Sequence, residues 1–346
     1  MEKPDWVFGN EKRFYDFIGS LNEGKILLVS HTDLDGIGSA RIIDEAVKSD
    51  EQLFLNYPEL EEGFVDRVKE REPKKVIISD LFFKAKNNAI PEIEKFADVL
   101  IIDHHSPERD FSSEKTVHMN AQNSCAAYLA YYLFSRSNNL EKLDWLAACS
   151  TIADVAYRHK PEFMREVFEK YGDKFETLPD GQIRKSGSMW DAQWKITLAL
   201  VATEPDYKRV FDSLSGKFGD IGDLEKLTLE VQREYDSLLS KFDNEREEIS
   251  GGYLWELDPH YKITSLLTSE VSFRYQNKTC IFVSPLSKGE GYKFSARRQD
   301  GAVDLNKFSG DLIKGFPNST AGGHPRASGG SFPKEYLAEF KKRLGI

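Results

Sequence analysis

Short runs of consecutive apolar residues, each followed at once by polar side chains, mark the first half of the chain. The clearest runs fall within residues 25–30, 76–79 and 99–102. Uninterrupted apolar runs of this length are typical of parallel strands that are buried on both faces, because a strand with one exposed face alternates apolar and polar residues. A weaker strand is predicted at residues 52–57. The pattern therefore predicts an α/β domain built on a parallel sheet.

Apolar residues at helical spacing separate these strands. Residues 160–205 are also helical in pattern but are broken by Pro161, Pro179 and Gly181, and we expect them to complete the first domain. Further helices are predicted over residues 11–22, 39–48, 61–69, 123–135 and 140–152.

The second half of the chain has a different pattern. Residues 224–249 carry a thin apolar stripe on a long charged segment, which predicts a helix that bridges two domains or packs in a homodimer. We expect a first domain over residues 1–205, a helical linker over 206–249, and a smaller α/β domain over 250–346 that lies across a cleft from the first. A chain of 346 residues is long enough for two such domains. Strands of the second domain are predicted at residues 253–257, 279–284 and 292–296.

Composition narrows the class of protein. The N-terminal residues MEKPDWVFGN lack the basic and apolar regions of a signal peptide, and no run of 18 apolar residues occurs. We therefore expect a cytoplasmic protein with no membrane partner. Cys125, Cys149 and Cys280 stand far apart among apolar neighbours, which favours buried free thiols over disulfides or a zinc knuckle.

Charge is unevenly distributed along the chain. The net charge is −10, yet residues 288–346 carry 11 Lys and Arg against 6 Asp and Glu, so the first 287 residues carry −15. An acidic body argues against a protein that coats nucleic acid by bulk attraction. An acidic first part with a basic C-terminal part suits a metal-dependent enzyme whose C-terminal residues bind an anion.

Acids and imidazoles stand where the three clearest predicted strands end. The first strand runs into HTDLDG at residues 31–36, the second ends at Asp80, and the third ends in the Asp-His-His triplet at residues 103–105. The carboxyl ends of parallel strands open into the crevice where α/β sheets bind ligands, so these side chains should converge. In an extended strand end, the three ligand-type residues of HTDLDG would point the same way, and the two histidines of the triplet would point to opposite sides.

Each cluster taken alone has a simpler interpretation. A lone Asp80 after a strand is commonly a helix cap or turn residue, and the 103–105 triplet could be a strand end with solvated histidines. The Asp-x-Asp-Gly segment could form an Asx turn or a calcium loop, but the other ligands of an EF-hand are missing. A fourth acid, Asp154, lies in a run of small apolar residues, where an unpaired charge is costly. Asp154 therefore needs a cationic partner.

The ligand types indicate a chemistry. Carboxylates and imidazoles suit Mn²⁺, with Mg²⁺ as the alternative ion. Two such ions, about 3.5 to 4 Å apart, can activate a water and stabilise the leaving oxygen of a phosphoester. No Walker loop, Ser-His-Asp pattern or cysteine nucleophile motif competes with this interpretation.

In order and spacing, the four segments resemble the motifs of the DHH phosphoesterase superfamily. That superfamily includes RecJ-type exonucleases, nanoRNases, pAp phosphatases, cyclic-dinucleotide phosphodiesterases and family II inorganic pyrophosphatases. The close His-x-Asp-x-Asp spacing most resembles archaeal RecJ-like proteins. The resemblance implies a two-manganese centre bridged by Asp80, with catalytic roles for His105, which would face the scissile phosphate, and for Asp103 behind it. The implied metal ligands are His31, Asp33 and Asp80 for one ion and Asp35, Asp80, His104 and Asp154 for the other.

A glycine-rich segment near the end of the chain, AGGHPRASGGSF at residues 321–332, carries one histidine and one arginine. Such a segment can let backbone N–H groups approach an anion, although structural turns have the same composition. It resembles the GGH motif of the DHH-associated C-terminal domain, and Ser295-Ala296-Arg297 resembles the Ser-x-Arg strand that precedes that motif. By resemblance, the substrate-binding residues are Arg297, Gly322, Gly323, His324 and Arg326.

We therefore expect a manganese-dependent phosphodiesterase that acts on the ends of single-stranded DNA or RNA. The alternatives are an enzyme for very short substrates, namely nanoRNA, pAp or a cyclic dinucleotide, and a catalytically silent scaffold of replication or repair. Since every motif position is filled, the enzyme is favoured over the scaffold. A replication or repair partner remains compatible with either.

Overall fold

The computed structural model describes residues 1–346 except 58–59, 61–62, 180 and 287–288. The chain divides into two compact units, residues 1–228 and 229–346. Helices α10 (Tyr207–Ser213) and η4 (Gly222–Leu224) lie within the predicted linker, yet their side chains Phe211 and Leu224 are part of the first unit's core.

The first unit is built on a six-stranded sheet with the order β1-β6-β5-β4-β2-β3. Five of its strands are parallel, and β1 is antiparallel to β6 at the edge. The predicted parallel α/β domain is therefore confirmed, although β1 and β6 were not predicted. The strands are β1 (Asp5–Phe8), β2 (Ile26–His31), β3 (Glu51–Leu55), β4 (Lys75–Ser79), β5 (Asp98–Asp103) and β6 (Thr116–Gln122).

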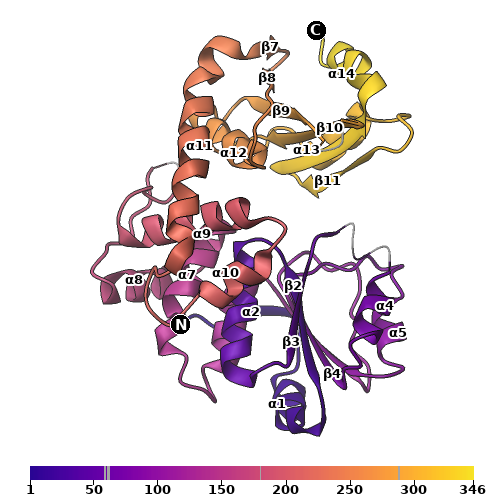
Figure 1. Cartoon of the computed structure of the whole chain (residues 1–346), viewed down its shortest axis with the longest axis vertical. Coiled ribbons are helices and arrows are strands. Elements are labelled where there is room, and N and C mark those ends of the chain that lie inside the picture. Colours follow the sequence, from indigo (N-terminus) through magenta and orange to yellow (C-terminus); the bar gives the residue numbers. More distant parts are fainter. Residues whose placement is uncertain (58–59, 61–62, 180, 287–288) are drawn as a thin grey trace. The chain divides into compact units, whose positions relative to one another are not determined.

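Both faces of this sheet are covered, which explains the uninterrupted apolar runs. Alternate residues of a strand point to opposite faces. Leu28 and Ile77 pack in one core with α1, α2, α6, α7, α8 and α9, while Val29 and Ile78 pack in a second core with α4 and α5. Helices α2 and α4 lie on opposite sides of the sheet (Figure 1). The helices are α1 (Glu11–Gly19), α2 (Leu34–Val47), α4 (Phe64–Lys69), α5 (Ala89–Ile93), α6 (Ala126–Phe134), α7 (Asp144–Ala153), α8 (Pro161–Lys170) and α9 (Ser188–Thr203). Short 3₁₀ turns are η1 (Leu21–Glu23), η2 (Glu141–Leu143) and η3 (Ala156–His159).

The second unit contains its own six-stranded sheet, with the order β11-β12-β10-β9-β8-β7. Strands β8 and β9 are parallel and the other neighbours are antiparallel. Phe294, Phe332 and Phe340 pack together in its core. Its elements are β7 (Glu247–Ile249), β8 (Gly252–Glu256), α12 (Thr264–Arg274), β9 (Thr279–Pro285), β10 (Gly291–Arg297), α13 (Leu305–Leu312), β11 (Thr320–His324), β12 (Ala327–Pro333), η5 (Lys334–Tyr336) and α14 (Leu337–Arg343).

Several element boundaries differ from the prediction. The long helix α11 (Glu225–Glu245) ends before residue 249, because residues 247–249 form strand β7. The helix predicted over 39–48 begins at Leu34, and residues 61–62 of another predicted helix lie outside the described residues. The three cysteines are buried free thiols, as predicted. In the described part of the chain, no helix combines the length and the apolar character needed to cross a bilayer.

Candidate metal centre

The acidic residues predicted from the strand ends meet where the order of the first sheet reverses. From β2 the chain moves to β3 on one side and then to β4 on the other, so the carboxyl ends of β2 and β4 form a topological switch point. Ligands of α/β sheets bind at such points because the loops after the two strands lead away in opposite directions and leave a crevice between them. His31 ends β2 and Asp80 follows β4, which places both at this position.

Asp33 is held by the start of helix α2. It is the N-cap residue, and its Oδ1 accepts a hydrogen bond of 2.9 Å from Gly36 N, which leaves Oδ2 3.0 Å from His31 Nδ1. The chain after β2 is thus helical rather than extended. The prediction that Asp33 and Asp35 point the same way is therefore wrong. A side chain on Gly36 would place its Cβ 2.4 Å from the carbonyl oxygen of His31, so only glycine permits this close turn.

Asp35 is fixed by a second helix. Its carboxylate accepts hydrogen bonds from the first backbone amides of α6, 2.6 Å from Ala126 N and 2.9 Å from Ala127 N. The N-terminus of a helix attracts an anion because its amides are otherwise unpaired and the helix dipole is positive there. Asp35 Oδ2 also lies 3.6 Å from His104 Nε2.

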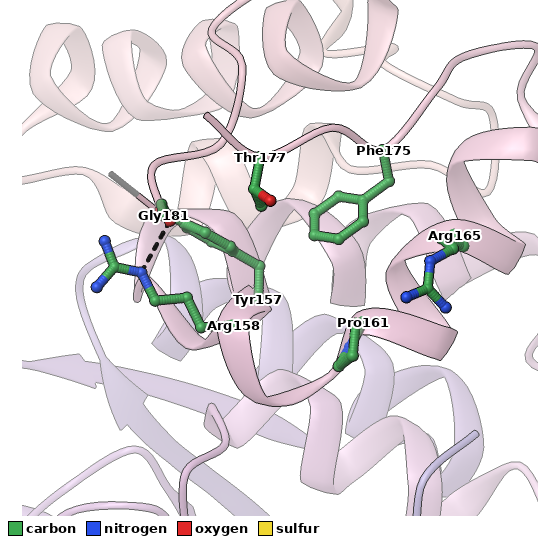
Figure 2. A pocket seen from close by; sticks show the side chains of 7 residues that line it. All are labelled: Tyr157, Arg158, Pro161, Arg165, Phe175, Thr177 and Gly181. Atoms are coloured by element: carbon green, nitrogen blue, oxygen red, sulfur yellow. Dashed lines mark hydrogen bonds between the residues drawn. The ribbon is translucent and has the colours of Figure 1, made fainter. Parts of the chain in front are cut away.

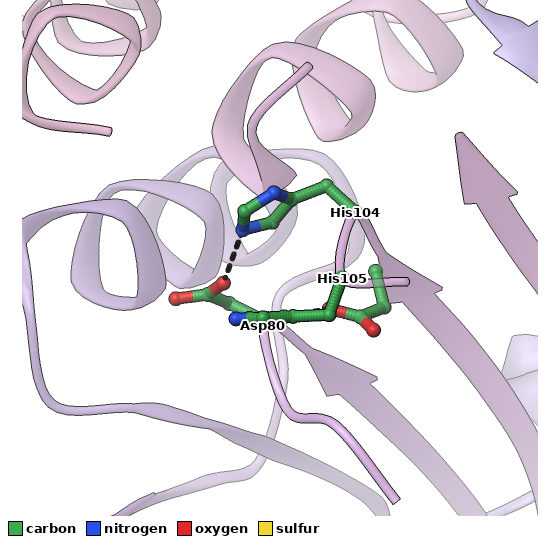
Figure 3. Close-up of side chains that lie close together, drawn as sticks. Asp80, His104 and His105 are labelled. Atoms are coloured by element: carbon green, nitrogen blue, oxygen red, sulfur yellow. Dashed lines mark hydrogen bonds and ion pairs between the residues drawn. The ribbon is translucent and has the colours of Figure 1, made fainter. Parts of the chain in front are cut away.

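Asp80 lies between two histidines. Its Oδ1 is 3.1 Å from His104 Nε2 (Figure 3), and its Oδ2 is 3.6 Å from His31 Nδ1. The residue is buried and has a φ of 58°, a left-handed conformation that costs energy outside glycine and recurs at functional sites. The serine hydroxyls of β2 and β4 bond to each other beneath it, with Ser30 Oγ 2.8 Å from Ser79 Oγ.

Asp154 completes the cluster from the C-terminal end of α7. It is the C-cap residue of that helix, and its Oδ2 lies 3.4 Å from His104 Nδ1. The imidazole of His104 therefore presents one nitrogen to Asp35 and Asp80 and the other to Asp154. All four segments singled out in the sequence are brought together, although they span residues 31–154.

His105 is positioned by two polar partners. Its Nδ1 lies 2.7 Å from Asp103 Oδ1, and since a carboxylate only accepts, Nδ1 carries the proton. Its Nε2 lies 3.0 Å from the Tyr57 hydroxyl. Strand β5 ends at Asp103, so strand alternation does not separate the two histidines, whose rings lie 4.3 Å apart.

Tyr57 is a site residue that the sequence did not reveal. It follows β3, its ring centre lies 5.0 Å from that of His31, and its side chain is partly exposed. Aromatic residues are common after strands, and no spacing links residue 57 to residue 105. Only the parallel pairing of β2 with β3 brings it to the cluster.

The acids of the cluster repel one another. Burial together with Asp80 raises the pKa of Asp35 well above its usual value, and burial raises the pKa of Asp154 to about 6 although His104 opposes this. Burial should lower the pKa of His104, but Asp154 and Asp80 outweigh it and hold this pKa well above the usual value. Such shifts indicate an excess of negative charge that a bound cation would relieve.

The donor set fits such a cation. Among the described residues, ligand atoms within 4.8 Å of one another form three groups. Carboxylate oxygens and imidazole nitrogens are ligands that Mn²⁺ and related divalent ions accept. The groups are His31, Asp33 and Asp80; Asp35, His104 and Asp154; and Asp80, Asp103, His104 and His105.

The predicted substrate-binding residues gather at one end of the second sheet. In the strand register, Arg297 of β10 and His324 of β11 both lie opposite Ala327 of β12. Arg297 Nη1 donates to the carbonyl oxygens of Ala296 and Ser328, 3.0 and 3.1 Å away, and burial lowers its pKa to about 10.

Arg326 lies in the turn between β11 and β12, where its side chain is beside the loop at residues 300–301. Its backbone carbonyl accepts from Arg298 N, and its positive charge helps to lower the pKa of Asp300, after the larger effect of the hydrogen bond from Arg298. Arg298 itself pairs with Asp300, Nε to Oδ1 at 2.8 Å. Arg298 is therefore engaged in an ion pair.

The glycines of this segment form a β-hairpin rather than an open loop. A Cβ on Gly330 would lie 2.1 Å from the carbonyl oxygen of Thr320, and one on Gly323 would lie 2.4 Å from that of Ala327. Close strand pairing thus accounts for these two residues. Gly322 is exposed and its Cβ would meet nothing within 4 Å, so pairing does not require glycine there.

Comparison with known proteins agrees with this geometry. The model of the DHH family N-terminal domain matches residues 25–157, and the model of the DHHA1 domain matches residues 250–345. No curated protein sequence matches the chain.

Solved structures share the whole fold at low identity. A crystal structure of exonuclease RecJ bound to manganese has a TM-score of 0.65 and 16% identity, over 98% of this chain and 94% of that one. CDC45 from Entamoeba histolytica has a TM-score of 0.61 and 11% identity, over 96% and 97%. The pGpG-specific phosphodiesterase PggH from Vibrio cholerae has a TM-score of 0.52 and 13% identity, over 92% and 97%.

The two matched domain models place the chain in the class of metal-dependent phosphoesterases. Within that class, the chain belongs to the DHH superfamily and carries the DHH-associated C-terminal domain.

Proposed function

We propose that this protein is a manganese-dependent phosphodiesterase that removes nucleotides from an end of single-stranded DNA or RNA. The observation that carries the proposal is the convergence of acids from four segments, with the two oxygens of Asp80 facing different histidines. The similarity to an exonuclease RecJ bound to manganese supports the ion and the reaction. We place the protein in the cytoplasm.

In this proposal the cluster holds two ions that share Asp80. Bound manganese would polarise the phosphate and make an attacking hydroxide available near neutral pH. Asp33 and Asp35 are already oriented by backbone amides, so little rearrangement is needed before an ion is bound. The proposed ligands are His31, Asp33 and Asp80 for one ion and Asp35, Asp80, His104 and Asp154 for the other.

His105 is proposed to bind the scissile phosphate. Asp103 keeps the proton on Nδ1 and orients the ring, so Nε2 is the nitrogen that can meet a phosphate oxygen. Burial should lower the pKa of His105, but Asp103 outweighs it and raises this pKa, which favours the imidazolium form. An imidazolium donates a charge-assisted hydrogen bond to phosphate. Tyr57 holds the same nitrogen before substrate arrives.

The C-terminal domain is proposed to hold the phosphates of the strand. Arg297 is the central candidate, because burial of a guanidinium without a described acidic partner leaves charge for an anion. His324, Arg326 and the exposed backbone of Gly322 lie at the same end of the sheet. The catalytic domain would then comprise residues 1–205 and the substrate-binding domain residues 250–346, with 206–249 as a helical linker whose first part packs on the core of the catalytic domain.

Two alternatives have support in the comparisons. The similarity to a pGpG-specific phosphodiesterase supports activity on very short substrates such as nanoRNA, pAp or a cyclic dinucleotide. The similarity to CDC45 supports a role as a partner in replication, with or without activity. We favour the enzyme because no ligand position of the cluster is lost.

The deciding experiment uses single strands of graded length, labelled at either end, with Mn²⁺. A ladder from one end is expected and gives the polarity, while DNA and RNA strands compared side by side give the preference. Asp80→Asn is the matched control, since it keeps the shape and removes the charge. Cleavage restricted to dinucleotides and short oligomers would replace the proposal with a nanoRNase. No cleavage of any strand by the manganese-loaded protein would contradict it.

A further inference from the structure

A pocket of about 290 Å³ lies in the first unit, outside the metal cluster (Figure 2). It is formed by η3, by the first half of α8 and by residues of the following loop. Figure 2 shows Arg158 and Arg165 on opposite sides of the pocket, with Phe175 and Thr177 between them and Pro161 facing these two. The lining residues are Tyr157, Arg158, Pro161, Arg165, Phe175, Thr177 and Gly181.

The aromatic side of the pocket is fixed in place. Tyr157 is buried, its hydroxyl accepts a hydrogen bond of 3.1 Å from Ile183 N, and its ring meets that of Phe175 at 6.4 Å between centres. Phe175 also packs against the buried ring of Phe168 at 5.5 Å. The pocket therefore offers a rigid aromatic surface rather than a loop that must first be ordered.

The two arginines bring positive charge to this surface. Arg158 is anchored through Nε, which donates to the carbonyl oxygen of Gly181 at 3.0 Å, so its terminal NH₂ groups are left for another acceptor. Arg165 stands at helical spacing from Glu162 and Glu169 on α8. Within the described part of the chain, neither arginine forms an ion pair with an acid.

The pocket is close to the metal cluster along the chain. Tyr157 follows Asp154 by three residues, so their Cα atoms are at most about 11 Å apart. Val155 between them has a φ of 58° and is 39% exposed. A left-handed β-branched residue is a strained exception, and strain of this kind collects at functional sites. It turns the chain sharply between the cluster and the pocket.

We propose that this pocket binds a phosphorylated nucleoside, with the base against Phe175, whose ring the buried Tyr157 supports, and the phosphate between Arg158 and Arg165. Aromatic rings accept any base by stacking, and arginine forks match phosphate oxygens. The volume of about 290 Å³ lies just below the usual range of ligand pockets, which begins at about 300 Å³, so the pocket has room for one nucleotide at most. The ligand is either a nucleotide of the bound strand, an inference that rests on the proposed function, or a free nucleoside monophosphate.

The test compares R158Q/R165Q with R209Q in manganese-loaded protein. Arg209 lies in the same unit, is exposed and pairs with Asp223, so it controls for loss of surface charge. One arm measures KM for strands of two to ten nucleotides. The other arm cross-links 8-azido-AMP to the protein and identifies the labelled peptides.

If the pocket holds a nucleotide of the strand, the double variant raises KM for strands of four or more nucleotides roughly ten- to hundredfold and leaves dinucleotides unchanged. If it holds a free nucleotide, 8-azido-AMP labels the peptides of Tyr157 or Phe175 in the wild type and not in the double variant. F175L, which keeps apolar volume but loses the stacking face, should lower the labelling by 8-azido-AMP.

The proposal is overturned if neither KM nor the labelling by 8-azido-AMP changes in the double variant, or if R209Q has the same effect. It is also overturned if hydrolysis of bis(p-nitrophenyl) phosphate and the unfolding temperature fall together with KM, because the arginines would then be structural. Should the wild type cleave no strand at all, the proposed function fails, but the cross-linking arm still decides on the pocket.

Discussion

Backbone groups orient the acids of the metal centre as much as side chains do. Gly36 N holds one oxygen of Asp33, and two amides at the start of α6 hold Asp35. A carboxylate fixed in this way keeps its direction whether or not an ion is present, which lowers the reorganisation that binding requires. Asp80 differs, because histidines are its neighbours and its backbone is in the left-handed region.

Asp80 is therefore the most informative single substitution. Asp80→Asn should abolish strand cleavage and lower bound manganese from two ions per chain to fewer than one, because both ions lose a charged ligand. The effect on metal affinity should exceed the roughly 10- to 100-fold that removal of an outer partner causes. Metal content by elemental analysis, measured beside activity, gives the result.

His31→Ala is the comparison for that experiment. It removes one neutral ligand from one ion, so we expect a milder loss of manganese and of rate than in Asp80→Asn. Normal metal content and rate in Asp80→Asn would refute the assignment of Asp80 as the shared ligand.

Tyr57 can be tested separately from the metals. Tyr57→Phe removes the hydroxyl that meets His105 Nε2 and keeps the ring beside His31. One neutral hydrogen bond contributes about 0.5 to 1.5 kcal/mol, so kcat/KM should change by roughly two- to tenfold while two manganese ions stay bound. A shift in the pH profile of kcat/KM is expected too, and a change in metal content would show that the hydroxyl supports the metal centre instead.

At the scale of elements, the chain order of apolar runs and acids predicted β2, β3, β4 and β5 of the first sheet and the convergence of the acids after them. Parallel strands place their carboxyl ends together, so residues after β2, β4 and β5 had to meet. The same reasoning failed for the start of α2, where capping by Asp33 competes with extension of the strand. For the 321–332 segment the sequence could not distinguish glycines that permit close strand pairing from glycines whose backbone can approach an anion, because the two kinds look alike in sequence.

The hairpin β11–β12 separates these two roles of glycine. Gly330→Ala places a Cβ against the carbonyl oxygen of Thr320 and should destabilise the second unit, whereas Gly322→Ala meets nothing and should leave its stability unchanged. Thermal unfolding checks both. If Gly322→Ala folds normally but weakens strand cleavage, backbone approach to the substrate is supported, and normal cleavage argues against it.

An ion pair between two elements of the first unit gives a pH-dependent prediction. Glu45 on α2 lies 2.7 Å from Lys142 Nζ on η2, and this hydrogen bond lowers the pKa of Glu45 to about 2 from 4.5. Because the folded state favours the charged form, the stabilisation is complete above pH 4.5 and is lost as the pH falls towards 2.

Glu45→Gln should therefore lower the free energy of unfolding by up to about 1 kcal/mol at pH 7, and progressively less below pH 4.5. The corresponding drop in unfolding temperature is roughly 2 to 4 °C. Glu169→Gln removes a charge from the same unit without a described ion pair and serves as the control. An equal drop at pH 7 and pH 3 would mean that Glu45 acts through packing.

At the scale of the whole molecule, the acidic first unit carries the proposed metal centre, and the basic end of the chain carries the proposed phosphate-binding residues. The cluster concentrates acids whose pKa values are raised by burial and by their neighbours, and that repulsion is stored in the folded protein. Folding and ion binding are therefore coupled in the first unit. Among the described residues, those that form this cluster all belong to the first unit.

Manganese should accordingly stabilise the protein. At a free concentration of one hundred times Kd, one ion adds about 2.7 kcal/mol, which corresponds to a rise of roughly 5 to 10 °C in the unfolding temperature of the first unit. Chelation should reverse it. Asp80→Asn should show little rise, and the same rise in that variant would indicate binding elsewhere.

The position of β1 at the edge of the sheet affects how this part of the chain folds during synthesis. Asp5 pairs with Gln122, and Glu2 accepts hydrogen bonds from the amides of Glu162 and Phe163 at the start of α8. At about 5 to 20 residues per second, β6 leaves the ribosome roughly 6 to 25 s after β1. During that interval Trp6 and its neighbours have no partner strand. Residues 2–8 are thus secured only after β6 and the start of α8 have been made, long after their own synthesis.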